Sequence, residues 1–213
     1  MHTVRLYTIY SKIVGTMISE DYFHQVLSSL PRQGPGYSEA TRKPWSLIPS
    51  VPSRPNILDI GCGTGAQTQD LATLSRGTIT AGDNYEPFLA RLAERAEREG
   101  LSERIRTPGL HPWTISPSTR KNSISSGPRE LSISWGSNGL SLWKQYCKHR
   151  GFIVVSDMAL FDSPAPEELI NFWKPYGVTV HTEEEKAQQI ADAELRLLHT
   201  VRLEEKGWAR TLL

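Results

Sequence analysis

The sequence predicts an α/β fold in which a doubly wound, Rossmann-like sheet carries helices on both of its faces. Three observations lead to this fold class. The short apolar segment 56–60 runs directly into a glycine cluster and a polar helix start, which is how the first unit of such a sheet begins. A second short strand, 78–81, precedes the clearest amphipathic helix of the chain, 86–99. A third apolar segment, 151–157, is followed by further helices, so strands and helices alternate.

The composition fits one domain and excludes several classes of protein. The chain has 213 residues, 38% of them hydrophobic, with 24 basic and 23 acidic side chains. It can therefore bury a core, and it lacks the basic excess that nucleic-acid-binding proteins usually show. Two cysteines and scattered histidines predict neither a disulfide framework nor a metal site. No apolar run approaches the roughly 20 residues of a membrane span, and the N-terminus is a poor secretion signal, so we expect a soluble cytoplasmic protein.

Before the first strand, the sequence predicts two short helices. Residues 19–30 place their apolar side chains on one side, with Ser19 as a plausible N-cap. The segment PRQGPG at 31–36 breaks this helix, and a second helix is expected at 38–48. Pro44 lies inside the second helix, where the loss of a backbone hydrogen bond costs about 3 kcal/mol.

The second half of the chain continues the alternation of helices and strands. Helices are expected at 140–148, 166–173 and 182–193. Thr182 and Glu185 have the spacing of a capping box at the start of the last of these helices. Residues 195–203 alternate between apolar and polar side chains and predict a further strand.

The most informative motif is DIGCGTG, from Asp59 to Gly65. Glycines at every second position permit the sharp turn from strand to helix and let a ligand approach the backbone closely. The helix N-terminus that follows offers free N–H groups and partial positive charge. Gly61, Gly63 and Ala66 also satisfy the dinucleotide pattern G-x-G-x-x-G/A, but a single match of that kind is weak.

Two carboxylates bear on the choice of ligand. Asp59 stands two residues before the first glycine, where it would face a dinucleotide pyrophosphate unfavourably but could receive an ammonium group. S-adenosylmethionine combines an amino-acid end with a nucleoside, so this position favours it. Asp83 ends the second strand, where a carboxylate can accept the ribose hydroxyls of either ligand. An NAD(P)-dependent oxidoreductase therefore stays open as an alternative.

These motifs resemble a known family. NILDIGCGTGAQTQDLA resembles motif I of class I S-adenosylmethionine-dependent methyltransferases, and ITAGDNYEPFL resembles their second motif. With MISEDYFHQVLSSLPRQGPG and GFIVVSD, the chain is similar to bacterial small-molecule methyltransferases of the "type 11" kind over most of residues 17–208. The resemblance implies a seven-stranded sheet and methyl transfer from S-adenosylmethionine to a small-molecule acceptor.

The resemblance also implies roles for individual residues. Asp83 would hold the ribose of the cofactor, and Asn84 would lie beside the adenosine. The methionine end would be held by Asp59, Gly61, Cys62, Gly63, Thr64 and Gly65. Residues 17–50 would form an N-terminal helical lid that includes Tyr22 and Phe23, and residues 51–213 would form the cofactor-binding domain.

No residue of the sequence identifies itself as catalytic. Asp157 ends a strand at the edge of the sheet where ligands bind, so it is an open candidate for a catalytic base. Cys62 is expected to be a small packing residue rather than a nucleophile. The mechanism is expected to depend on positioning the acceptor, because the sulfonium already supplies a good leaving group.

Residues 107–137 do not fit the pattern of the rest of the chain. They are rich in Ser and Pro and would form a loop of about 30 residues, which is uncommon inside a compact domain. The family has an acidic residue and its fourth, central strand in this region. Rereading residues 113–137 in a shifted frame is compatible with a peptide that contains an acidic turn, the strand FDLIWA and a glycine-bearing loop. We therefore hypothesise two compensating frameshifts, and we expect the fourth strand to be missing or distorted.

The two ends of the sequence lead to related expectations. Residues 1–16 precede a natural-looking start at Met17 and are expected to be a non-native extension. The chain stops before the last strand of the family's sheet, so that strand is expected to be missing. A non-catalytic remnant is therefore a second alternative, and we expect this exact chain to be inactive. The sequence leaves the methyl acceptor and the oligomeric state open.

The frameshift hypothesis makes a prediction about the coding DNA. Reading that DNA in the shifted frame across residues 113–137 should give the expected acidic turn and strand, because the hypothesis places the two frameshifts at the ends of this segment. Sequencing the genomic region provides the measurement. Codons that are incompatible with the shifted peptide would contradict the hypothesis.

Overall fold

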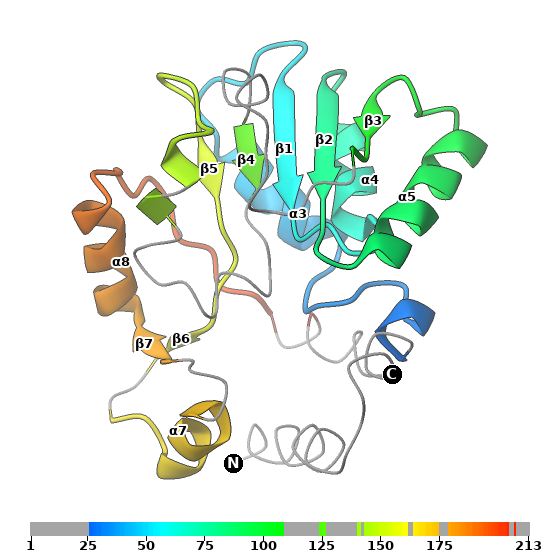
Figure 1. Cartoon of the computed structure of the whole chain (residues 1–213). Coiled ribbons are helices and arrows are strands. Elements are labelled where there is room, and N and C mark those ends of the chain that lie inside the picture. Colours follow the sequence, from blue (N-terminus) through cyan, green and yellow to red (C-terminus); the bar gives the residue numbers. More distant parts are fainter. Residues whose placement is uncertain are drawn as a thin grey trace.

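The computed structural model describes residues 26–108, 124–126, 140–141, 143–161, 164–174, 179–204 and 207. Within them, five strands form one sheet in the order β3-β2-β1-β4-β5, with helices packed against it (Figure 1). The strands are β1 (Asn56–Ile60), β2 (Thr78–Gly82), β3 (Ile105–Arg106), β4 (Ile124–Ser126) and β5 (Ile153–Val154). Every neighbouring pair of these strands is parallel, so the predicted doubly wound α/β fold is confirmed.

The order of the strands determines where a ligand can bind. β1 pairs with β2 on one side and with β4 on the other, so the chain runs from β1 to β3 in one direction and returns after β3 to the other side of β1. Open α/β sheets bind ligands outside the carboxyl ends of the strands at such a switch point. The carboxyl end of β1 is where the glycine loop begins.

Three helices cover one face of the sheet. They are α3 (Ser38–Ser46), α4 (Ala66–Leu74) and α5 (Glu86–Arg98). The buried apolar side chains of α4 and α5 form one cluster with Ile57 of β1, Ile79 of β2 and Ile105 of β3, and the partly buried Trp45 of α3 packs against it. α5 behaves as its sequence predicts: Phe88, Leu89, Leu92 and Ala96 are its buried residues.

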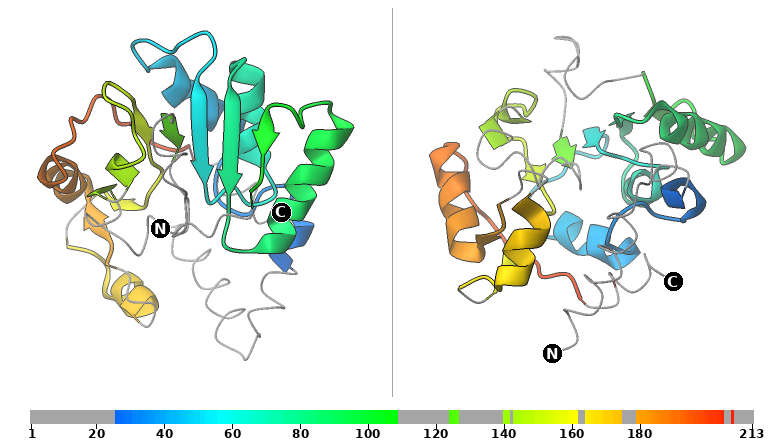
Figure 2. Two further views of the ribbon diagram at one scale, coloured as in Figure 1. Left: turned by 45° about the horizontal axis from the view of Figure 1, so that its top comes forward. Right: turned by 60° about the horizontal axis from the view of Figure 1, so that its bottom comes forward.

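Residues of β1 that alternate with Ile57 point to the other face. Leu58 and Ile60 form a second buried cluster with Trp143 and Tyr146. Trp143 is one of the helical residues 140–141 and 143–144, and Tyr146 follows them. α8 (Glu183–Asp192) contributes Ile190 to the edge of this cluster. The sheet is therefore buried on both faces, and Figure 2 shows α5 and α8 at opposite ends of it.

A smaller unit lies beside the main sheet. Strands β6 (Ala159–Leu160) and β7 (His181–Thr182) pair in parallel, and α7 (Glu167–Trp173) lies in the chain between them. The predicted capping box is confirmed, because the backbone N–H of Glu185 donates to Thr182 Oγ1 at 3.1 Å and the N–H of Thr182 donates to Glu185 Oε2 at 2.9 Å. This cap fixes the start of α8 directly after β7.

The second predicted helix forms as α3, and it contains its proline as expected. Pro44 lies in the last turn of α3, where it removes the hydrogen bond to the carbonyl of Ala40.

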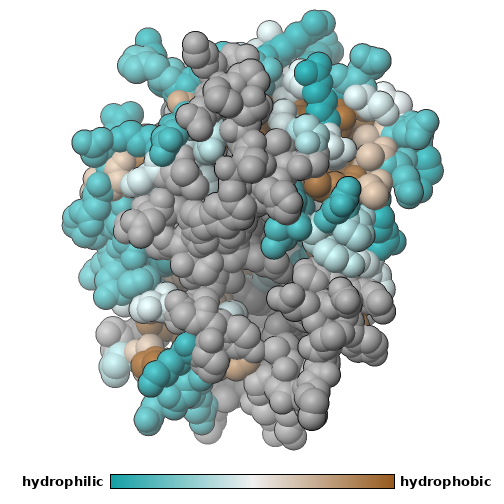
Figure 3. Space-filling view, viewed as in Figure 1, coloured by the Kyte–Doolittle hydropathy of each residue, from teal (hydrophilic) through white to brown (hydrophobic). Residues whose placement is uncertain are grey.

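On the face of the molecule shown in Figure 3, the described side chains at the two margins are mostly hydrophilic, as expected for solvated helix faces. No helix in the described part of the chain is long and apolar enough to cross a membrane.

Two sequence-based predictions about strands need correction. Residues 195–203 form no strand, although their side chains alternate, because no strand of the described part of the chain pairs with them through a ladder of hydrogen bonds. Leu197, Leu198 and Val201 of this segment are exposed instead. The segment 151–157 forms a strand only at β5, where β4 offers two partner residues.

The fourth strand is short rather than missing. β4 has only three residues, and Ile57, Leu58 and Asp59 of β1 are their partners in register. The seven-stranded sheet that the resemblance implies is represented by five strands in the described residues. The rest of the segment 107–137, the N-terminal residues 1–25 with Tyr22 and Phe23, and the last six residues lie outside the described part, apart from Thr107 and Pro108.

The packing of α5 yields a stability prediction. Leu92 is fully buried between α5 and the sheet, so L92A should lower the free energy of unfolding by about 2–5 kcal/mol. Leu197 is 45% exposed, so the matched variant L197A should change it by no more than about 0.5 kcal/mol. Urea unfolding measured by circular dichroism checks both values. Equal losses for the two variants would contradict this description of the core.

Candidate functional site

The glycine loop lies where the carboxyl ends of β1 and β2 meet. The backbone N–H groups of Gly61 and Cys62 both donate to the carbonyl of Gly82, with N–O distances of 2.8 and 3.1 Å. Gly82 is the last residue of β2 and the partner of Ile60 in register. The loop therefore starts beside the end of the neighbouring strand, and it turns at once into α4.

This turn needs glycine for two physical reasons. Gly61, Gly63 and Gly65 have φ angles of +71°, +54° and +88°, which other residues adopt only with strain. A Cβ at Gly65 would also lie 2.2 Å from Leu92 Cδ1, so α5 packs directly against this part of the loop. The glycines thus permit both the fold of the loop and its close contact with α5.

Asp83 connects the loop to the turn after β2. Its Oδ2 accepts a hydrogen bond from the N–H of Gly63 at 2.8 Å, and its Oδ1 accepts one from the N–H of Tyr85 at 3.1 Å. The side chain is therefore held in one orientation beside the glycine loop. The structure places this predicted residue at the carboxyl end of β2, as its position in the sequence suggested.

Asp59 is deeply buried at the carboxyl end of β1. Only 1% of the residue is exposed, and its Oδ2 accepts a hydrogen bond from Thr68 Oγ1 at 2.7 Å. Its Oδ1 accepts a longer one, 3.4 Å, from Gln67 Nε2. Both donors belong to the first turn of α4, so Asp59 attaches this helix to β1 and places its charge under the glycine loop.

The two aspartates create a negative potential at the loop. Burial raises the pKa of the Cys62 thiol well above its ordinary value, and the charges of Asp59 and Asp83 raise it further. Cys62 is therefore a neutral, buried thiol, as expected of a packing residue. A negative potential of this kind favours a cationic group in the adjacent space.

A further side chain near the loop carries positive charge. Arg32 Nη2 forms an ion pair with Asp70 Oδ2 of α4 at 3.1 Å, and the charges of Asp70 and Asp59 partly offset the effect of burial, which lowers the pKa of Arg32. Arg32 Nη1 is buried and has no hydrogen-bond partner among the described residues.

Two predicted residues lie apart from this arrangement. Asn84 is exposed directly after Asp83. Asp157 follows β5 and forms an ion pair with Lys186 Nζ of α8 at 2.5 Å. Burial raises the pKa of Asp157, while the hydrogen bond and charge of Lys186 lower it. Because Lys186 holds its carboxylate, Asp157 is poorly suited to act as a freely accessible base.

Sequence reasoning did not single out Thr68 or Gln33. Thr68 is one of several polar residues in α4, and only the structure shows that it is buried next to Asp59. Gln33 lies in the segment PRQGPG, which the sequence identified only as a helix break. Its side-chain oxygen accepts hydrogen bonds from the N–H and the hydroxyl of Thr64, at 2.8 and 2.9 Å.

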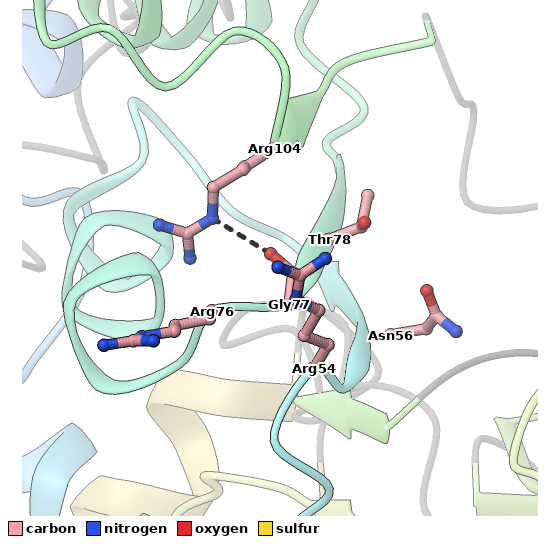
Figure 4. A pocket seen from close by; sticks show the side chains of 6 residues that line it. All are labelled: Arg54, Asn56, Arg76, Gly77, Thr78 and Arg104. Atoms are coloured by element: carbon pink, nitrogen blue, oxygen red, sulfur yellow. Dashed lines mark hydrogen bonds between the residues drawn. The ribbon is translucent and has the colours of Figure 1, made fainter.

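A cavity of about 520 Å³ lies at the other end of the strands (Figure 4). It is lined by Arg54, Asn56, Arg76, Gly77, Thr78 and Arg104. Arg104 Nε donates to the carbonyl of Gly77 at 3.1 Å, and its Nη2 donates to the carbonyls of Ala72 and Ser75. This arginine therefore stabilises the C-terminal end of α4, and the cavity contains none of the predicted site residues.

In the described part of the chain, no group of three or more His, Cys, Asp or Glu side chains lies close enough together to hold a metal ion. The glycine loop lies at the N-terminus of α4 and beside two carboxylates, Asp59 and Asp83. Such an arrangement can hold an amino acid joined to a nucleoside, because the N-terminus of α4 suits an anionic end and Asp83 suits ribose hydroxyls.

Known proteins share both the motif and the fold. A sequence model of the methyltransferase domain family matches residues 57–112, which include the glycine loop and Asp83. No curated protein sequence is similar enough to the chain to count as a match.

Several solved structures have the same fold. YjhP from E. coli superposes with a TM-score of 0.74 at 20% identity, over 89% of this chain and 77% of YjhP. An S-adenosylmethionine-dependent methyltransferase from Thiobacillus denitrificans, in complex with S-adenosyl-L-homocysteine, gives 0.72 at 17% identity, over 91% of this chain and 78% of its own. A geranyl diphosphate methyltransferase in complex with GPP and sinefungin gives 0.66 at 14% identity and 78% coverage, and this chain spans 62% of its length. Residues 57–112 therefore carry the sequence signature of a methyltransferase domain, in a chain that has the fold of class I S-adenosylmethionine-dependent methyltransferases.

Proposed function

We propose that this chain binds S-adenosylmethionine at its glycine loop, and that the activity of its family is transfer of the methyl group to a small-molecule acceptor. The observation that carries the proposal is the pair of carboxylates, Asp59 and Asp83, at the ends of β1 and β2. Both lie next to a loop of the type that binds nucleoside ligands, and the matched methyltransferase domain includes both.

The charge of the site favours this cofactor over a dinucleotide. S-adenosylmethionine carries a sulfonium, an ammonium and a carboxylate group and is a net cation, whereas a dinucleotide carries two negative charges on its pyrophosphate. Two unit charges 4 Å apart interact by about 4 kcal/mol at the effective dielectric constant of a protein surface. Burial is the main reason for the raised pKa of Cys62, and the charges of Asp59 and Asp83 add to it. The same two charges attract the cationic groups of the first ligand and repel the pyrophosphate of the second.

The backbone of the site supports the same assignment. Asp83 is fixed by the N–H groups of Gly63 and Tyr85, so its carboxylate is oriented before any ligand arrives. We assign the ribose hydroxyls to Asp83, the amino-acid end to the loop from Gly61 to Gly65, and the adenosine to the side of Asn84. Asp59, which is buried between β1 and α4, contributes its negative charge to the site.

Methyl transfer then needs little acid–base chemistry from the protein. The cofactor supplies an activated methyl group on a sulfonium, which leaves as a neutral thioether. The task of the chain is to align the nucleophile of the acceptor with this methyl group and to exclude water. We assign no catalytic residue, which is consistent with the ion pair that holds Asp157.

We further propose that the acceptor is a small molecule and that the protein acts in the cytoplasm without nucleic acid. The balance of 24 basic and 23 acidic side chains supports the absence of a nucleic-acid partner, because phosphate backbones select proteins with a clear basic excess. One similar structure, the geranyl diphosphate methyltransferase, was solved with GPP, a small molecule.

The cofactor assignment predicts a difference in binding between two ligands. The purified chain should bind S-adenosylhomocysteine in isothermal titration calorimetry and should show no binding of NADH at the same concentrations. The D83N variant should bind S-adenosylhomocysteine about 10-fold more weakly or worse, because hydrogen bonds to charged groups contribute about 1.5–3 kcal/mol. Asp192 of α8 provides the control: it accepts a hydrogen bond from Gln188, and D192N should bind like the wild type. Preferential binding of NADH would favour the oxidoreductase instead.

The potential at the loop can be measured without any ligand. In a C147S background, D83N removes a negative charge near Cys62, so the pKa of Cys62 should fall and a small thiol reagent should modify it faster at fixed pH. The pH dependence of the modification rate gives the pKa of this thiol. D192N again serves as the control, and equal rates in the two variants would rule out an electrostatic effect of Asp83 on the loop.

A further inference from the structure

The segment 26–36 precedes α3, and the side chain of Gln33 connects it to the glycine loop. Gln33 Oε1 accepts hydrogen bonds from the backbone N–H and from the hydroxyl of Thr64, at 2.8 and 2.9 Å. Thr64 stands directly before Gly65, the N-cap of α4. The amide oxygen of Gln33 therefore takes donors at a helix N-terminus, where anionic groups bind well.

The side chain of Gln33 also covers the surface that a ligand has to approach. A Cβ built on Gly63 would lie 2.5 Å from Gln33 Oε1 and 3.3 Å from its Cδ. The absence of a side chain at Gly63 thus leaves a space that the amide group of Gln33 fills. No ligand atom can contact the loop at this position while Gln33 stays there.

From this geometry we propose that Gln33 occupies the place of the cofactor's carboxylate on the glycine loop and leaves it when the cofactor binds. The inference rests on the proposed function, since it assigns a carboxylate-bearing ligand to this loop. A carboxylate and an amide oxygen are both acceptors, so they compete for the same N–H and hydroxyl of Thr64. Gln33 is then a residue that sets the affinity for the amino-acid end of the cofactor.

The replacement of the Gln33 amide oxygen by the carboxylate requires only a local movement. Gln33 Nε2 donates to the carbonyls of Leu27 and Leu30, at 3.1 and 3.0 Å, so the amide links the helical turn at 26–29 to the loop. The neighbouring Arg32 is anchored separately to α4 by its ion pair with Asp70. A rotation of the Gln33 side chain can therefore free Thr64 while the segment remains attached to the domain.

The proposal predicts opposite effects for two substitutions. Q33A removes the competing acceptor and should bind S-adenosylhomocysteine about 2- to 10-fold more tightly, the factor expected for one net hydrogen bond. Q33E places a negatively charged acceptor on the same donors and should bind it more weakly than the wild type. Isothermal titration calorimetry gives the three dissociation constants.

A truncated ligand shows whether the effect belongs to the carboxylate. 5′-Methylthioadenosine has the nucleoside and the sulfur but lacks the amino-acid end, so its affinity should differ less than about 2-fold between wild type and Q33A. Gln188 of α8 is a matched control, because its amide also forms a side-chain hydrogen bond but lies on another element. Q188A should bind both ligands like the wild type, and thermal unfolding shows that each variant is folded.

Three outcomes would overturn the inference. These are weaker or unchanged binding of S-adenosylhomocysteine by Q33A, tighter binding of both ligands by the same factor, and tighter binding by Q33E. If wild type and Q33A both fail to bind either ligand, the proposed function itself is wrong and the inference falls with it. Binding by Q33A alone would support both.

Discussion

The parallel pairing of β1 and β2 is the constraint from which the rest of the site follows. The register that sets Ile60 opposite Gly82 ends the two strands at the same level, so the carbonyl of Gly82 can accept the N–H groups of Gly61 and Cys62. The loop after β1 is thereby held against the turn after β2. Asp83, which follows Gly82 directly, then reaches the N–H of Gly63. A different register would separate the glycine loop from this carboxylate.

The same site shows how closely stability and binding are coupled here. Asp59 attaches α4 to β1 through Thr68, and its buried charge contributes to the potential at the loop. Leu92 packs α5 onto Gly65, at the beginning of α4. Residues that position the loop are therefore also part of the core, so substitutions at Asp59 affect folding together with ligand binding. Asp83 lies nearer the surface, so its effect on binding is easier to isolate.

Through Gln33, the segment 26–36 takes part in ligand binding at the glycine loop as well as in packing. Arg32 and Gln33 are adjacent in the chain, yet one is attached to α4 and the other contacts the glycine loop. The segment thus stays docked through one residue while the other is able to exchange with a ligand. This division explains how a part of the chain that precedes the sheet can influence the affinity of a loop that follows β1.

The sequence by itself determined the alternation of strands and helices, the glycine loop and the two aspartates. These features depend on local patterns: apolar segments of strand length, the amphipathic helix α5, and glycines where φ is positive. The capping box at Thr182 and Glu185 is local as well, and it was predicted correctly. The roles of the individual loop residues in ligand binding remain predictions.

Only the tertiary structure decided which segments pair and which side chains meet. Residues 195–203 alternate like a strand, but a strand also needs a neighbour to satisfy its backbone, and none is present among the described residues. β4 exists as three residues because β1 offers it a ladder, although its own sequence has no strand pattern. The contact between Gln33 and Thr64 spans 31 positions of the chain, and the bond between Asp59 and Thr68 joins a strand to a helix. Such contacts depend on how elements pack in space, which no local pattern of residues specifies.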